Sequence, residues 1–241
     1  RLYISDETGG GVVIVDPVGG GVIGRIPVGK RPRGLRLSRD GSQLLVALSG
    51  SPIAGPGVDE STLPPPDRSA DGIGIVDLAT GRVSRVLRSG QDPETFDLSA
   101  DGTMLYVSNE ETAEMSVVDV ASGEVRSRVK VGDQPEGVTV RPGSHEVYVT
   151  SEGTNEVSIV DTTTGTVVTV LETGARPRAV AFTADGATAF VTNENGAALT
   201  VIDAARHAAS SVIVIPRSPG APAAPKPMGV VLAPDGARAF V

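Results

Sequence analysis

The sequence predicts an all-β protein and, more specifically, a β-propeller of four-stranded antiparallel blades. Three observations support this prediction. The chain repeats about every 42 residues, each repeat holds four short runs of strand-forming residues, and glycine-containing turns join these runs. A repeat of about 40–45 residues with four strands is typical of a propeller blade, which buries both faces of its sheet only against neighbouring blades.

The repeat is visible in three kinds of residue that recur in phase. A Val-Asp or Ile-Asp pair ends an apolar run, a proline opens the unit, and an Asp-Gly turn follows it. The aspartates that end the apolar runs are separated by 61, 42, 42 and 42 residues, so the second unit carries about 19 additional residues. The recurring residues are Asp16, Asp77, Asp119, Asp161 and Asp203; Pro32, Pro93, Pro135, Pro177 and Pro227; and Asp40, Asp101, Asp185 and Asp235.

The third unit shows the expected strands most clearly, at residues 95–99, 104–108, 115–119 and 124–131. The first two runs are joined by Asp101-Gly102, a pair typical of tight hairpins, and the last two by Ser122-Gly123. The chain begins with the second strand of one blade and ends with the second strand of another. We therefore expect four whole and two partial blades in one propeller domain over 1–241, with further blades outside this chain because propellers close their ring.

Two segments interrupt the repeat and are predicted to be loops. Residues 50–72 contain five prolines and no alternation of apolar and polar residues, and residues 216–227 are similarly rich in proline. Proline cannot donate a hydrogen bond to a neighbouring strand, so both segments should leave the sheets. Long loops on repeat scaffolds carry function in some proteins and are plain surface insertions in others.

Composition excludes several classes of protein. The net charge of −8 argues against general nucleic-acid binding, and the absence of cysteine excludes disulfides and thiol chemistry. No apolar run reaches the length of about 18 residues that a membrane-spanning helix needs. The sequence has no CxxCH motif for haem, no GxSxG motif and no P-loop, and both histidines, His145 and His207, fall in hairpin turns.

The unit "MLYVSNEETAEMSVVDVASGEVRSRVKVGDQPEGVTVRPGS" resembles the YVTN-type β-propeller repeat, as do "EVYVTSEGTNEVSIVDTTTG" and "AFVTNENG". The order of the opening motifs "KRPRG", "GQDPETF", "DQPEG", "ARPRAV" and "KPMGV" is similar to that of seven-bladed periplasmic propellers associated with pyrroloquinoline-quinone (PQQ)-dependent alcohol catabolism. The resemblance implies a periplasmic or secreted protein that accompanies quinoprotein dehydrogenases and c-type cytochromes. It covers the chain except for the two inserts, and it implies about two more blades.

The residues around the opening prolines change charge from blade to blade, from Arg-Pro-Arg to Asp-Pro-Glu. In a propeller, the connections between blades and the loops between second and third strands open on the same face. The two sets of polar residues should therefore meet at the mouth of the central channel. The predicted binding residues there, called the charged ring below, are Arg31, Arg33, Asp92, Glu94, Glu136, Arg176 and Arg178, with Asn109, Glu110 and Asn193 as a second tier.

Two interpretations of the charged ring remain open. The charges tie neighbouring blades together, or they form a site for an anionic ligand, because arginine side chains suit carboxylates, phosphates and the acid groups of a quinone. Deeper in the channel, Arg36 and Asp97 occupy equivalent positions on successive inner strands and are expected to pair. Acidic and amide residues at the mouth could hold calcium, but their recurrence is explained more simply by the repeat, so no metal or cofactor is assigned. The mouth residues outside the charged ring are Asp6, Glu7, Ser151, Glu152, Glu194 and Lys226.

Three functional hypotheses follow. The first, which we favour, is a non-catalytic periplasmic propeller that binds a small anionic ligand or a protein partner such as a quinoprotein dehydrogenase or cytochrome c. The second is a lactonase-like hydrolase or lyase, which would need an acid–arginine cluster with a strongly shifted pKa in the mouth. The third is a cell-surface adhesion propeller of the kind found in surface-layer proteins.

Overall fold

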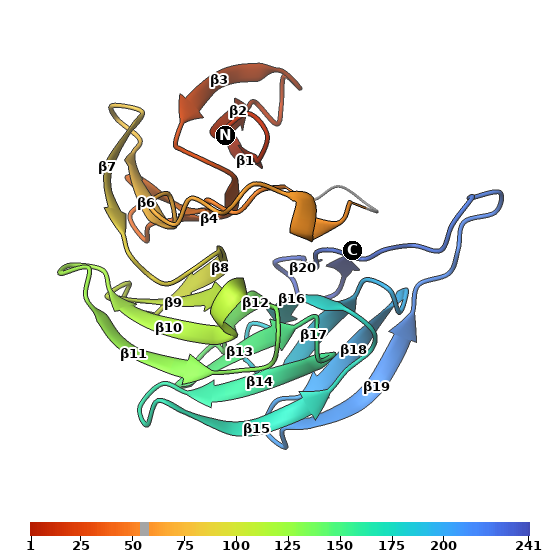
Figure 1. Ribbon diagram of the computed structural model, residues 1–241. Helices are drawn as coiled ribbons and strands as arrows, with labels where there is room; N and C mark the ends of the chain where they lie inside the picture. Colours follow the sequence, from red (N-terminus) through yellow and green to blue (C-terminus); the bar gives the residue numbers. More distant parts are fainter. Residues whose placement is uncertain (54–57) are drawn as a thin grey trace.

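The computed structural model describes residues 1–53 and 58–241, and within these ranges its regular elements are strands and two 3-10 turns (Figure 1). The strands form four antiparallel sheets of four strands, one sheet of three strands and one of two. This confirms the predicted β-propeller fold and its four whole and two partial blades. The predicted seven-bladed ring remains an expectation. Within the same ranges no helix is long and apolar enough to span a bilayer.

We number the blades 1 to 6 in chain order, and within each blade the strands pair in sequence order. Blade 1 is β1 (Leu2–Asp6), β2 (Gly11–Val15) and β3 (Val22–Pro27); blade 2 is β4 (Pro32–Leu37), β5 (Gln43–Leu48), β6 (Gly72–Asp77) and β7 (Arg82–Leu87); blade 3 is β8 (Pro93–Leu98), β9 (Met104–Asn109), β10 (Glu114–Asp119) and β11 (Val125–Lys130). Blade 4 is β12 (Pro135–Val140), β13 (Glu146–Ser151), β14 (Glu156–Asp161) and β15 (Thr166–Glu172); blade 5 is β16 (Pro177–Phe182), β17 (Thr188–Asn193), β18 (Ala198–Asp203) and β19 (Ala208–Val214); blade 6 is β20 (Val231–Leu232) and β21 (Ala239–Phe240).

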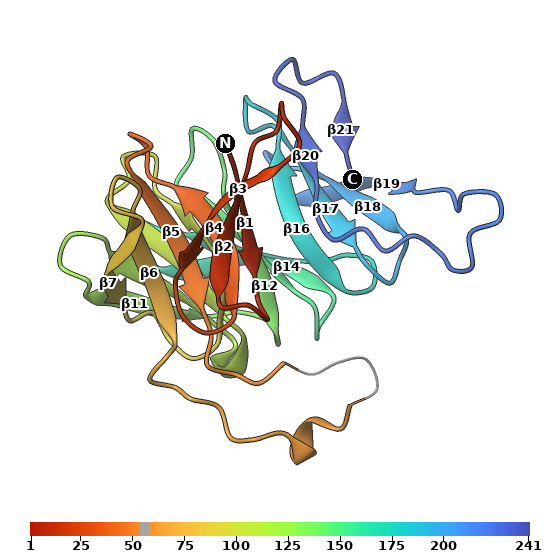
Figure 2. The same ribbon diagram turned by 90° about the horizontal axis from the view of Figure 1, so that it is seen from above.

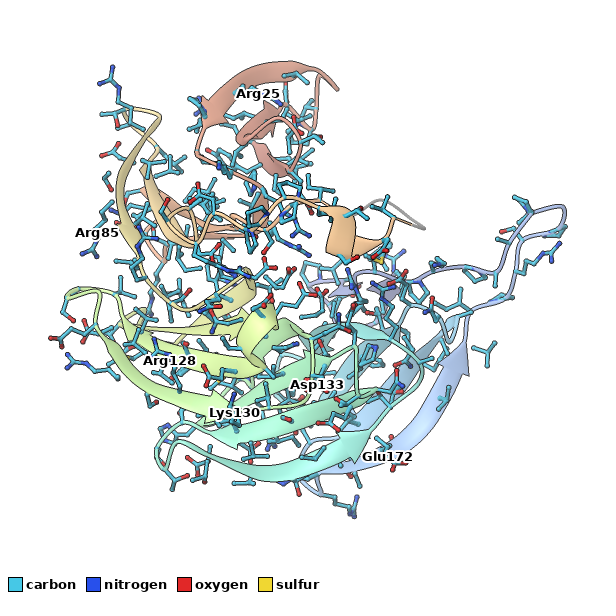
Figure 3. The ribbon with its side chains drawn as sticks, viewed as in Figure 1. Arg25, Arg85, Arg128, Lys130, Asp133 and Glu172 are labelled. Atoms are coloured by element: carbon cyan, nitrogen blue, oxygen red, sulfur yellow. The ribbon has the colours of Figure 1, made fainter. Side chains whose placement is uncertain are left out.

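The first strand of each whole blade lies innermost. Strand β8 contacts β4 and β12, and β12 also contacts β16, so these strands stand side by side around the centre of the arc (Figures 1 and 2). The fourth strands lie on the outside, where Arg85, Arg128 and Lys130 are exposed (Figure 3). The exposed outer strands and the strand-to-strand contacts at the centre place the inner strands beside the channel, as the repeat predicts.

The hydrophobic core is divided into clusters, each of which lies between two consecutive blades. Between blades 2 and 3, for example, Ile73 and Ile75 pack with Phe96, Leu105 and Val107. Equivalent clusters join blades 1 and 2, blades 3 and 4, and blades 4 and 5. The alternating apolar residues of each sheet are therefore buried by the neighbouring blade, as expected for a repeat that cannot bury its faces alone.

The described residues of the first insert lie along the mouth of the channel. Its described residues between β5 and β6 contain one regular element, the 3-10 turn η1 (Glu60–Thr62). Residues 54–57 of the predicted loop lie outside the described residues. The second insert, 216–227, contains no strand, and Lys226 reaches Glu194 of blade 5 with an Nζ–Oε1 distance of 3.3 Å. The described parts of both proline-rich segments therefore leave the sheets, as predicted.

Candidate functional site

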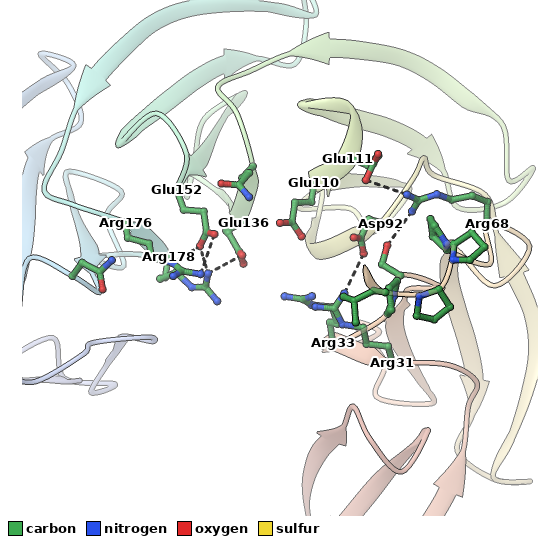
Figure 4. A pocket seen from close by; sticks show the side chains of 18 of the residues that line it. Arg31, Arg33, Arg68, Asp92, Glu110, Glu111, Glu136, Glu152, Arg176 and Arg178 are labelled. Atoms are coloured by element: carbon green, nitrogen blue, oxygen red, sulfur yellow. Dashed lines mark hydrogen bonds and ion pairs between the residues drawn. The ribbon is translucent and has the colours of Figure 1, made fainter. Parts of the chain in front are cut away.

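A cavity of about 1130 Å³ lies at the mouth of the channel (Figure 4). Its wall is formed by the residues that open blades 2 to 5, by the loops between second and third strands, and by the first insert. Five arginines line it, and so do five acidic residues of blades 3 and 4. The charged residues of its lining are Arg31, Arg33, Arg68, Arg176, Arg178, Asp92, Glu110, Glu111, Glu136 and Glu152.

The backbone at each opening proline is distorted in the same way. The residue before the proline has a positive φ in all four whole blades: 38° at Arg31, 55° at Asp92, 51° at Gln134 and 58° at Arg176. All four residues line the cavity. Residues with a Cβ rarely adopt a positive φ. Each such residue carries a strain energy on the order of 1–3 kcal/mol, and residues of this kind cluster at functional sites.

A β-bulge follows the proline in each of these blades. The pairing of first and second strands shifts between Pro32 and Leu35 and at the three equivalent places. The residue just after the proline lies in this bulge, and bulges redirect side chains. The bulge residues are Arg33, Glu94, Glu136 and Arg178.

Between blades 2 and 3, arginines meet carboxylates across the junction. Arg33 forms an ion pair with Glu94, and Arg31 Nη1 lies 3.8 Å from Asp92 Oδ1. Deeper in the channel, Arg36 Nε lies 3.0 Å from Asp97 Oδ1, so the two residues form the expected pair. Asp97 also accepts a hydrogen bond from the Val140 amide of blade 4. The opposite charges of the two opening motifs therefore fasten these blades together.

Blades 4 and 5 are joined in the same way with the charges reversed. Arg178 Nη1 lies 2.8 Å from Glu136 Oε1 and also forms an ion pair with Glu152. Arg176 Nε lies 2.9 Å from Glu152 and 3.1 Å from Glu194. Both arginines still line the cavity, and Figure 4 shows them across it from Arg31 and Arg33, with Glu110 and Glu136 between.

Between blades 3 and 4, an acidic opening motif faces another acidic opening motif. Carboxylate oxygens of Asp92, Glu94 and Glu110 lie within 4.8 Å of one another, and so do those of Glu110, Glu136 and Glu152. We call these five residues the acidic cluster. Arginines of the flanking blades 2 and 5 relieve part of the repulsion between these carboxylates. The opening motifs of blades 3 and 4 themselves contain no arginine.

Two carboxyl groups of this cluster are shifted toward the protonated form. Burial raises the pKa of Glu136 to about 7, although the positive charges of Arg178 and Arg33 oppose the shift. Burial also raises the pKa of Glu94 well above its usual range; the negative charge of Glu136 adds to this shift and Arg33 opposes it. A carboxyl group that titrates near neutral pH beside an arginine can both hold and release a proton under ordinary conditions.

The structure separates the other predicted site residues from the cavity. The side chains of Asn109 and Asn193 are fully buried, and their amides donate to Ser116 Oγ and Thr200 Oγ1 within their own blades, each at 2.9 Å. Glu94 does not belong to the cavity lining, and its side chain is 1% exposed. Neither His145 nor His207 belongs to the cavity lining.

The sequence interpretation missed the contribution of the first insert. Pro64, Pro65 and Pro66 form part of the cavity wall, and Arg68 pairs with Glu111 at 3.0 Å and with Asp71 at 3.3 Å. The proline content signalled that this segment leaves the sheet, but nothing in its local pattern indicated where it lies. Only the position of the insert, between a second and a third strand, placed it on the mouth face.

Comparisons with known proteins support the fold. No family model matches the chain, and no curated protein matches its sequence. Among solved structures, the chain is similar to Kuenenia stuttgartiensis hydrazine synthase, with 26% identity and a TM-score of 0.68, over 85% of this chain. It is also similar to a functionally unknown protein from Desulfotomaculum acetoxidans, with 13% identity and a TM-score of 0.74, over 97% of this chain and 69% of that one. The chain spans 53% of the hydrazine synthase chain that it matches. These likenesses support the assignment of the chain to the β-propeller fold.

Proposed function

We propose that this protein is a non-catalytic binding propeller whose mouth cavity receives a small ligand with carboxylate groups. The observation that carries the proposal is the presence of five arginines on two sides of one cavity of about 1130 Å³, a volume just above the usual range for small-molecule sites. Arg33 also has a buried Nη1 atom without a hydrogen-bond partner among the described residues. Guanidinium groups with free donors bind carboxylates in a fixed geometry.

The resemblance to YVTN-type propellers associated with PQQ-dependent alcohol catabolism supports a more specific form of this proposal. In that form the protein acts in the periplasm beside a quinoprotein dehydrogenase or cytochrome c, and the ligand is a quinone acid or a small hydroxy acid. We carry no activity over from hydrazine synthase, because the shared region is part of a longer chain.

The test is a thermal melting screen with PQQ, small hydroxy acids and lactones on the purified chain. A ligand at 100 times its Kd should stabilise the protein by about 2.7 kcal/mol. Arg176→Gln and Arg68→Gln should each reduce the stabilisation, because both side chains line the cavity and both are partly exposed. Arg206→Gln is the matched control, since Arg206 is 81% exposed and lies in a hairpin turn away from the cavity. Stabilisation that persists in both cavity variants would contradict the proposed site.

One observation favours a second candidate, a lactonase-like hydrolase or lyase. Glu136 lies in the cavity beside Arg178, and its pKa is raised to about 7. This is the acid–arginine arrangement that the second hypothesis requires, with Glu136 positioned to transfer a proton and Arg178 to stabilise an oxyanion. Steady turnover of a lactone by the wild-type chain, lost in Glu136→Gln, would replace the non-catalytic proposal; binding without turnover would retain it.

A further inference from the structure

The acidic residues at the junction of blades 3 and 4 have no opposite charge within that junction. Arginine faces acid between blades 2 and 3 and again between blades 4 and 5, whereas Asp92, Glu94 and Glu110 of blade 3 face Glu136 of blade 4. Placing several buried carboxylates together is costly unless a proton, a cation or further hydrogen bonds compensate their charge.

One carboxylate of this group has an oxygen available for a ligand. Glu94 is 1% exposed; Arg33 contacts its Oε2 atom, and its Oε1 atom is buried without a hydrogen-bond partner among the described residues. In the neighbouring Asp92, Oδ1 accepts a hydrogen bond from Ser49 and forms the ion pair with Arg31. The Oδ2 atom takes part in neither of these two contacts. Glu94 therefore has a buried oxygen without a partner, and one of its carboxylate oxygens lies within 4.8 Å of oxygens of Asp92 and Glu110, an arrangement that a bound cation would satisfy.

We propose that Asp92, Glu94 and Glu110 form a calcium site at the rim of the mouth cavity. Carboxylate oxygens are the ligands that calcium prefers, at about 2.3–2.6 Å, so two oxygens on opposite sides of the ion lie up to about 5 Å apart. The three carboxylates lie within 4.8 Å of one another, which this ion spans. Magnesium demands a near-ideal octahedron and loses its water reluctantly, whereas calcium accepts irregular arrangements of carboxylates, so three carboxylates from two connections favour calcium.

The elements that hold the three residues are well defined. Asp92 and Glu94 flank the proline that begins β8, and Glu110 begins the 3-10 turn η2 (Glu110–Thr112) directly after β9. Asp92 and Glu94 are held by buried contacts, while Glu110 is partly exposed and lines the cavity. Calcium would therefore have protein ligands on one side and water or a ligand on the cavity side.

The test is isothermal titration of the full chain, dialysed against a chelator, with calcium chloride and with magnesium chloride at pH 7.5 in 100 mM potassium chloride. We expect one calcium ion per chain and weaker binding of magnesium. Glu110→Gln should weaken calcium binding at least ten-fold, and because no ion pair of Glu110 is among the described contacts, this change should leave the fastening of the blades intact.

Glu111→Gln is the matched control. Glu111 is the next residue along the chain and lines the same cavity, but it pairs with Arg68 and lies outside the three carboxylates. Calcium binding should be the same in this variant as in the wild type. No calcium binding at millimolar concentration, tighter binding of magnesium, or equal loss in the two variants would each overturn the proposal. Melting of the titrated samples verifies that both variants are folded.

Discussion

The junction between blades 2 and 3 and the junction between blades 3 and 4 are built from the same repeat but held in different ways. The first uses ion pairs, with Arg33 against Glu94 and Arg36 against Asp97. Among the described residues, the second has no arginine–carboxylate pair between its opening motifs and uses mainly hydrogen bonds between side-chain hydroxyls and the backbone. Thr95 Oγ1 donates to the Glu136 carbonyl at 2.5 Å and accepts from the Val138 amide at 3.1 Å, and Ser108 Oγ donates to the same carbonyl at 2.7 Å.

This difference separates the two interpretations of the charged ring. Where opposite charges meet, the ring fastens blades, and most of its members are paired. Where like charges meet, the hydroxyl–backbone bonds and the apolar cluster between the blades carry the packing. The carboxylates at that junction do not hold blades 3 and 4 to each other, although Glu94 and Glu136 pair with arginines of the outer neighbours, blades 2 and 5. Their remaining oxygens are available for a ligand or a proton.

We expect the largest loss of stability from Arg33→Ala, which removes the arginine of the ion pair between blades 2 and 3. It leaves the buried Glu94 without its partner, and removal of one member of a buried ion pair costs about 3–5 kcal/mol of stability. Urea denaturation at pH 8 measures this loss. The loss should become smaller as the pH falls, because burial raises the pKa of Glu94 and a protonated carboxyl group depends less on the arginine. The double variant Arg33→Ala with Glu94→Gln should recover part of the stability. If Arg33→Ala is neutral at pH 8, the junction does not depend on this pair.

An effect of similar or smaller size is expected from pH at the acid–acid junction. The pKa of Glu136 is about 7 in the folded protein, against 4.5 as the ordinary value, so between these values the folded state binds more protons than the unfolded chain. The free energy of unfolding should therefore fall by up to about 3 kcal/mol as the pH rises from 4.5 to 7, and then level off. The shifted pKa of Glu94 acts in the same direction.

Glu136→Gln isolates this contribution, because glutamine has nearly the same shape and does not titrate. Its stability should depend less on pH between 4.5 and 7 than that of the wild type. The hairpin aspartates do not interfere, since serine and backbone donors lower the pKa of Asp40 and Asp101 to about 2 and these groups titrate below this range. Stability that rises from pH 4.5 to 7, or equal slopes in the two proteins, would contradict the assignment.

The smallest effect is expected from Arg36→Ala. The Arg36 side chain is 44% exposed, and ion pairs with an exposed partner contribute about 0–1 kcal/mol. Asp97 keeps its hydrogen bond from Val140 of blade 4, so it is not left uncompensated. A loss of stability below about 1 kcal/mol in chemical denaturation would agree with this account. A loss as large as that of Arg33→Ala would mean that pairing, rather than burial, sets the strength of this junction.

The recurring prolines, aspartates and turn glycines were sufficient to predict the blades, because each unit is stabilised mainly by local hairpins and by contacts with the next copy. The same periodicity placed Arg31, Arg33, Glu136, Arg176 and Arg178 around one mouth, and the structure brings them to one cavity. Asn109 and Asn193 share the loop positions of cavity residues, but their side chains turn into their own blades. The side-chain direction at these positions depends on the buried Ser116 and Thr200, which no pattern of charge reveals.

The sequence by itself determined the repeat, the number of blades in this chain, the strand order and the face on which the charged motifs gather. Only the tertiary structure decided which charges are paired, because pairing depends on the bulge and the positive φ at each opening proline and on the approach of the next blade. A Cβ at Gly34 would lie 3.0 Å from the Glu94 carbonyl and from the Thr95 Cα, so the glycine of that motif permits this approach. The raised pKa of Glu136 likewise arises from burial between two blades, which a linear sequence does not contain.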